Sequence, residues 1–169
     1  MNTTKDVEKN RKRTRLLDMK LDEGTRHALM VVNIIMICSI LIHDGDHVRQ
    51  AFMWSYSIPV SLLVLNLVVY LPTAIAIFLT KTRRFSATLV TAFGGLNTAI
   101  AFAKVHLLGA ASGLWGIWNE PYVDLGVDWL SWVILAEVVF IGIAVACAGM
   151  YYCGIVVEQS RKADASDQA

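Results

Sequence analysis

The chain has 169 residues, of which 56% are hydrophobic and only 17% are charged, and its formal net charge is +1 at pH 7. This composition is more apolar than that of an average water-soluble domain, and the length fits a single domain. It excludes a disordered chain, and the near-neutral charge excludes a nucleic-acid binder that acts through net charge. Three cysteines without a paired spacing exclude a disulfide-stapled secreted domain.

Four apolar runs predict an all-α integral membrane protein, a four-helix bundle with spans at about 26–43, 56–80, 85–108 and 129–157. A hydrocarbon layer of about 30 Å requires roughly 20 apolar residues per helix, and each run reaches or approaches that length. Residues 43–54 are then expected to form an outer loop. A basic leader over 1–25 and a disordered cytoplasmic tail over 158–169 complete the predicted organisation.

The basic residues predict how the spans are oriented. Of the 15 Lys and Arg, eight lie in the first 26 residues, three in the 81–84 turn and two in the C-terminal tail. Because Lys and Arg concentrate on the cytoplasmic side of membrane proteins, both termini are expected to be cytoplasmic. We interpret the chain as a multi-pass protein of a prokaryotic plasma (inner) membrane.

The segment before the fourth apolar run predicts a short interfacial amphipathic helix. Aromatic and aliphatic residues recur there at steps of three and four, and acidic residues recur every four on another face. The apolar stripe comprises Trp115, Trp118, Tyr122, Leu125, Trp129 and Trp132, and the acidic face comprises Glu120, Asp124 and Asp128. In the third run, many Gly, Ala and Ser residues predict the most enclosed helix of the bundle, since small residues allow helices in lipid to approach closely.

The outer half of the bundle collects the residues that could carry chemistry. Residues 43–47 read His-Asp-Gly-Asp-His, and His106 stands at a similar level near the end of the third run. If residues 43–47 are helical, their two histidines lie one turn apart on one face, as a metal site requires. We therefore predict a site for zinc or copper, with ligands His43, His47, His106 and Asp46.

Three further residues are assigned around this predicted site. Asp44 is expected to orient a ligand from behind. Lys104 and Glu137 lie deep enough in their spans that an unpaired charge would be costly, and we pair them with each other as a buried ion pair. Two alternatives stay open for residues 43–47: a solvated loop that turns at Gly45, or a site that handles a proton or a small solute.

A resemblance follows from these residues. The motif at residues 43–47 after a first span, the lone His106 at the end of the third, and a segment containing Pro121, Tyr122 and Asp124 before a fourth resemble a group of uncharacterised small four-span prokaryotic membrane proteins that carry His-x-Gly-Asp-His. The resemblance covers residues from about 26 to 155. It implies a four-span fold and brings no activity with it.

The sequence thus favours a small polytopic inner-membrane protein with an outward-facing polar His/Asp/Glu site for a transition metal. One alternative is a non-catalytic accessory or assembly subunit of a larger membrane complex, and another is a small proton- or cation-coupled transporter. No phosphate-binding loop, Ser-His-Asp context or CxxC pair is present, so we assign no catalytic residues and no organic cofactor. The expected partners are the lipid bilayer and either another membrane protein or a second copy of the chain, with nucleic acid excluded.

Overall fold

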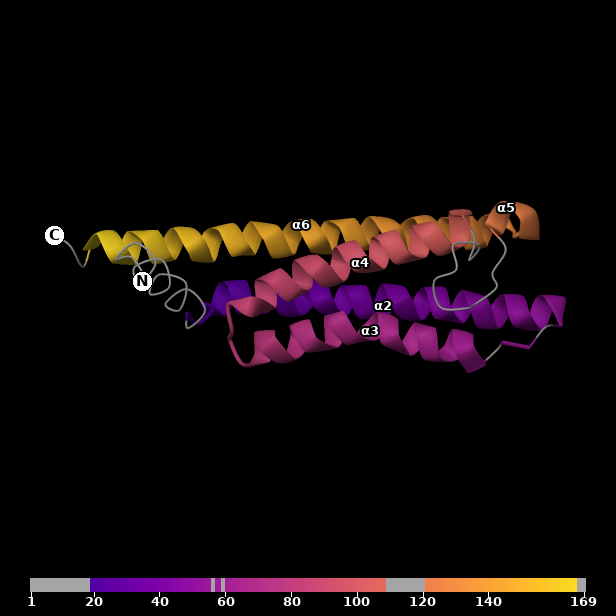
Figure 1. The fold of residues 1–169 in the computed structure, drawn as a ribbon, viewed down its shortest axis with the longest axis horizontal. Helices are drawn as coiled ribbons and strands as arrows, with labels where there is room; N and C mark the ends of the chain where they lie inside the picture. Colours follow the sequence, from indigo (N-terminus) through magenta and orange to yellow (C-terminus); the bar gives the residue numbers. More distant parts are fainter. Residues whose placement is uncertain (1–18, 56, 59, 109–120, 167–169) are drawn as a thin grey trace, which may run out of the picture.

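The structure is a computed structural model, and it describes residues 19–55, 57–58, 60–108 and 121–166. These residues form helices α2 (Glu23–Trp54), α3 (Val60–Lys81), α4 (Ser86–Leu108), α5 (Tyr122–Leu125) and α6 (Trp129–Ser166). Four long helices lie along a common axis, with the start of α2 and the end of α6 at one end of the bundle and α5 at the other (Figure 1). The predicted all-α class is confirmed for the described part of the chain.

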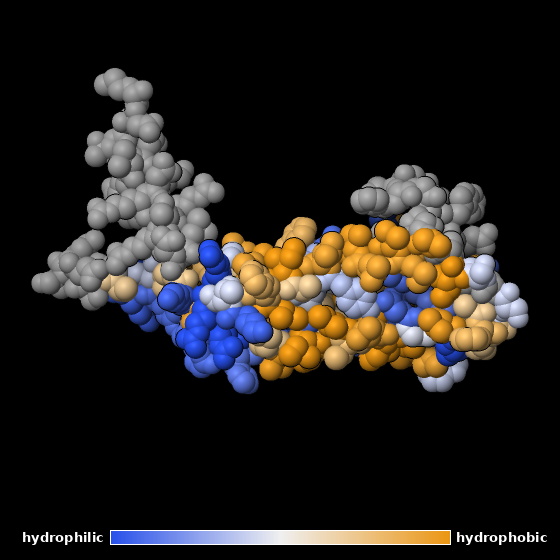
Figure 2. Space-filling view, turned by 90° about the horizontal axis from the view of Figure 1, so that it is seen from below, coloured by the Kyte–Doolittle hydropathy of each residue, from blue (hydrophilic) through white to orange (hydrophobic). Residues whose placement is uncertain are grey.

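The helices and the surface of the bundle are compatible with a membrane protein. Helices α2, α4 and α6 are long and apolar enough to cross a bilayer, and Asn66–Lys81 of α3 forms a shorter apolar helix. Hydrophobic side chains cover the middle of the molecule, while hydrophilic ones gather near the end where α2 begins (Figure 2). Such an apolar belt is suited to contact with lipid.

Close packing of α4 against α6 holds the centre of the bundle. A Cβ atom built on Gly95 would lie 2.5 Å from the carbonyl oxygen of Gly142, and one on Gly149 would lie 2.5 Å from the backbone nitrogen of Ala92. The two backbones therefore touch wherever these glycines meet. Half of the apolar window of α4 is buried, against 33% for α2 and 28% for α6, which confirms that α4 is the most enclosed span.

Helix α2 corrects the predicted outer loop. It starts at the cap residue Asp22, whose side chain accepts a hydrogen bond from the Thr25 N–H at 2.9 Å, and it runs without a break through residues 43–47 to Trp54. The helix continues because its polar side chains form hydrogen bonds with residues one turn later in the same helix. Asp46 accepts hydrogen bonds from Arg49 and Gln50, at spacings of three and four residues.

The outer segment and the tail also differ from expectation. A helix does precede α6, but α5 is a single turn that ends where Gly126 adopts a left-handed φ of 62°. The aromatic stripe is therefore not carried by one continuous helix, and Trp115, Trp118 and Glu120 lie outside the described residues. The predicted disordered tail is wrong as far as residue 166, because α6 continues to Ser166, with an ion pair between Glu158 and Lys162 one turn apart.

Candidate metal centre

Three histidines meet in the interior of the bundle. His43 and His47 lie one turn apart on α2, and His106 comes from the last turn of α4. All three are buried, and one nitrogen from each lies within 4.8 Å of the others. The ring of His43 lies 4.7 Å from each of the other two, and the rings of His47 and His106 lie 5.4 Å apart, measured between centroids. The predicted trio of nitrogen ligands is thus brought together.

The geometry between His47 and His106 suits a shared ion. Their Nε2 atoms are 3.4 Å apart. Two nitrogens bound tetrahedrally to one zinc ion, each at about 2.0–2.1 Å, would be separated by about 3.3 Å. The pair of Nε2 atoms therefore already stands at the spacing of two ligands on one metal ion.

A backbone carbonyl of α4 orients the His106 ring. Its Nδ1 lies 2.8 Å from the carbonyl oxygen of Phe102, one turn earlier on α4. Because a carbonyl only accepts hydrogen bonds, Nδ1 must carry the hydrogen, and the Nε2 of a neutral ring is left with its lone pair directed at His47. Histidines that bind metals are held in this way, by a carbonyl or carboxylate on the other ring nitrogen.

His43 has neither ring nitrogen satisfied. Both are buried without a hydrogen-bond partner among the described residues. A buried polar atom without a partner carries a desolvation cost of about 1–3 kcal/mol. Both nitrogens could therefore take up a hydrogen bond or a metal ion.

Aromatic rings enclose the three histidines. The ring centroid of Phe102 lies 4.3 Å from that of His43, and the ring centroid of Tyr122 on α5 lies 4.6 Å from that of His106. Both pairs are arranged edge to face. Tyr122 is itself buried and packs against Trp132 of α6. These rings lower the local polarity, which would strengthen the electrostatic interactions of a cation with the histidines if one were bound there. From the sequence, Tyr122 is expected in an interfacial stripe, and its contact with His106 is not predicted.

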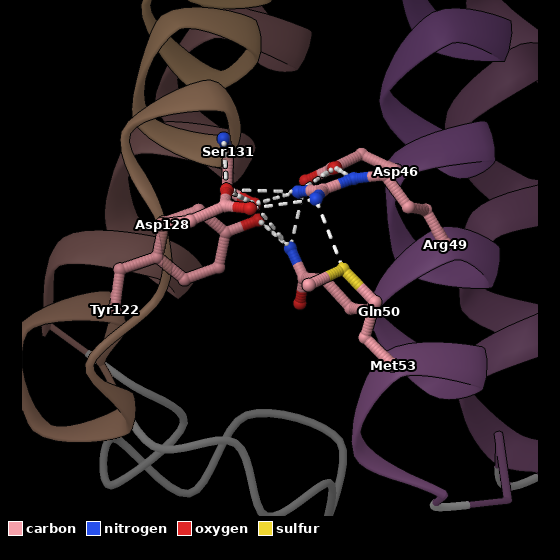
Figure 3. Close-up of polar contacts among 7 residues, drawn as sticks. All are labelled: Asp46, Arg49, Gln50, Met53, Tyr122, Asp128 and Ser131. Atoms are coloured by element: carbon pink, nitrogen blue, oxygen red, sulfur yellow. Dashed lines mark hydrogen bonds and ion pairs between the residues drawn. The ribbon is translucent and has the colours of Figure 1, made fainter.

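Asp46, which was predicted as a fourth ligand, does not belong to the histidine cluster. One of its carboxylate oxygens accepts from Arg49 at 2.7 Å and the other accepts from Gln50 at 2.7 Å. Both oxygens are therefore occupied in a polar network beside the histidines. Figure 3 shows this network joining α2 to the start of α6, through Arg49 bonds to Asp128 and Ser131 at 2.6–2.9 Å and a Gln50 bond to Ser131 at 2.8 Å.

Asp128 belongs to this network and lies just before α6. The hydrogen bonds from the Arg49 guanidinium hold the pKa of its carboxyl well below the usual range, and the backbone N–H of Ser131 acts in the same direction. The carboxylate is thus ionised at neutral pH and fixes the start of α6 to α2. If residues 43–54 had been predicted as helical, the spacing of Arg49 and Gln50 after Asp46 would have predicted the hydrogen bonds within α2, but not those to Asp128 and Ser131.

Lys104 and Glu137 do not form the predicted ion pair. The carboxylate of Glu137 accepts a hydrogen bond from Ser39 of α2 at 2.8 Å, and no ion pair to Lys104 is present in the part of the chain that the structure describes. The reason is the direction of the side chains around α4. At 100° per residue, Lys104 lies about 180° from Gly95, which touches α6. Lys104 and Glu137 therefore do not meet, although they lie at a similar depth along their helices.

No protein-family model, curated protein or solved structure matches the chain. The resemblance of residues 43–47 to the His-x-Gly-Asp-His motif of small four-span prokaryotic proteins stays a prediction.

Proposed function

We propose that the chain is a four-span protein of a prokaryotic plasma membrane, with both termini cytoplasmic, that holds a transition-metal ion on His43, His47 and His106 in its outer half. The observation that carries the proposal is the buried trio itself. Two Nε2 atoms stand 3.4 Å apart, and the third ring has no hydrogen-bond partner among the described residues. The distribution of Lys and Arg supports the orientation.

The donor set points to zinc or copper. Imidazole nitrogens suit both ions, whereas calcium and magnesium prefer oxygen ligands, and the one nearby carboxylate proposed as a ligand, Asp46, is engaged elsewhere. Three protein ligands leave one position of a tetrahedral ion open to an additional ligand. Sites of this kind bind and activate small molecules, whereas purely structural zinc sites use four protein ligands.

The accessory-subunit alternative has less support from the packing. It would be favoured by small-residue faces left uncovered after the bundle forms. Gly95, Gly142 and Gly149 instead face the opposite helix within the α4–α6 pair. The metal site is therefore the function that the geometry supports best.

The test is the metal content of the protein purified in detergent with zinc or copper added. We expect about one tightly held ion per chain, lost in His43→Ala and in His106→Ala. His27→Ala is the matched control, because His27 is exposed at the start of α2, far along the helix from the trio. Wild-type protein that retains no ion, or histidine variants that retain as much as the wild type, would overturn the proposal.

A further inference from the structure

Two buried polar atoms without partners face each other beside the metal centre. They are the Nδ1 atom of His43 and the Oδ1 atom of Asp44, and neither has a hydrogen-bond partner within the described chain. They lie 3.9 Å apart. This is longer than a hydrogen bond by about 0.7 Å or more, so a small rotation of either side chain would satisfy both atoms.

The other oxygen of Asp44 is held from α3. The hydroxyl of Tyr70 donates to Oδ2 at 2.7 Å, which ties the Asp44 carboxylate of α2 to α3. The donor pattern is informative, because a phenol hydroxyl that donates to one oxygen leaves the second free to accept. Tyr70 thus presents Oδ1 of Asp44 to His43.

We propose that Asp44, held by Tyr70, is the positioning residue for His43. This inference rests on the proposed function. When the metal draws His43 into place, Oδ1 accepts the Nδ1–H hydrogen, which leaves Nε2 bare and directed at the ion. Asp44 then does for His43 what the carbonyl of Phe102 does for His106.

The arrangement gives α3 a part in the site. The three histidines come from α2 and α4 alone, while Tyr70 reaches the centre through Asp44. A carboxylate behind a ligating imidazole also raises its basicity and therefore its affinity for the ion. Loss of such a group typically lowers metal affinity about 10- to 100-fold.

The experiment compares four variants with the wild type. Asp44→Asn and Tyr70→Phe remove the carboxylate charge and the hydroxyl that holds it. Asp124→Asn and Tyr151→Phe are matched controls at exposed positions on α5 and α6. Zinc affinity is measured by competition with a chromophoric chelator, and the electron paramagnetic resonance spectrum is recorded with copper(II) bound.

We expect Asp44→Asn to weaken zinc binding by about 10- to 100-fold and Tyr70→Phe by less. Both should change the copper hyperfine splitting, and neither control should. Asp44→Glu should recover part of the affinity. The spectrum reports on the ligand itself, so a purely structural role would not move it.

The two proposals fail in different ways. If the wild type binds zinc while Asp44→Asn and Tyr70→Phe bind it equally well with unchanged copper spectra, Asp44 is not a positioning residue and the metal centre stands. If the wild type binds neither ion, the metal centre itself is refuted, and the role of Asp44 falls with it. Should Asp44→Asn fail to fold, Tyr70→Phe alone decides the inference, because it leaves the carboxylate in place.

Discussion

Replacing Gly149 by alanine should force α4 and α6 apart. A Cβ atom at this position would lie 2.5 Å from the backbone nitrogen of Ala92, 2.7 Å from the carbonyl oxygen of Thr88 and 2.8 Å from the Cα atom of Ala92. All three are backbone atoms, so no side chain can rotate out of the way. Ordinary contact at 3.4 Å or more requires the helices to separate locally by about 0.9 Å, the difference between 3.4 and 2.5 Å.

The control for this variant is Gly154→Ala on the same helix, where no described atom lies within 4 Å of the added Cβ. Alanine favours a helix over glycine by about 1 kcal/mol, and this gain is common to both variants. Overpacking a tight contact costs about 1–3 kcal/mol. Since the contacts at Gly149 are with backbone, we expect a difference near the upper end, about 3 kcal/mol in the free energy of unfolding.

The assay is unfolding of each variant by titration with sodium dodecyl sulfate from mild-detergent micelles, followed by circular dichroism. Gly149→Ala should unfold at a lower fraction of the denaturing detergent than the wild type, and Gly154→Ala at the same fraction or a higher one. Equal behaviour of the two variants would refute the close packing of α4 on α6.

Three further predictions follow from the structure. Because hydrogen bonds lower the pKa of Asp128 in the folded state, its contribution to stability is complete above the ordinary carboxyl pKa of about 4 and is lost as the pH falls below that value. Asp128→Asn should therefore flatten the fall in melting temperature between about pH 5 and pH 2. The Ser39→Ala and Glu137→Gln changes should be non-additive in a double-mutant cycle of unfolding, whereas additive energies would mean that their hydrogen bond contributes nothing. With the native cysteines replaced, a cysteine at Asp124 should react with an impermeant thiol reagent outside the cell and one at Thr82 should not, and the reverse result would invert the proposed orientation.

The positions of the helices could be read largely from hydropathy. The second, third and fourth apolar runs correspond to α3, α4 and α6, because long apolar segments in a membrane protein have few alternatives to a helix. The ends were less predictable. Polar residues normally mark the end of a span, and the sequence alone does not show that Asp46 bonds to Arg49 and Gln50 within a continuing helix.

The candidate metal-binding residues were partly predictable for a related reason. The spacing of His43 and His47 places them on one helix face, and hydropathy places His106 at a matching depth. The direction in which each side chain points around its own helix depends on packing between helices. That direction separates Lys104 from Glu137, and hydropathy carries no information about it.

X-ray absorption spectroscopy at the edge of the bound metal tests the central claim most directly. For the zinc-loaded protein, we predict nitrogen or oxygen ligands at about 2.0–2.1 Å and outer-shell scattering from three imidazole rings, with the contribution of one ring lost in His106→Ala. A sulfur shell near about 2.3 Å, or a spectrum that is the same with and without His106, would contradict a centre built from His43, His47 and His106.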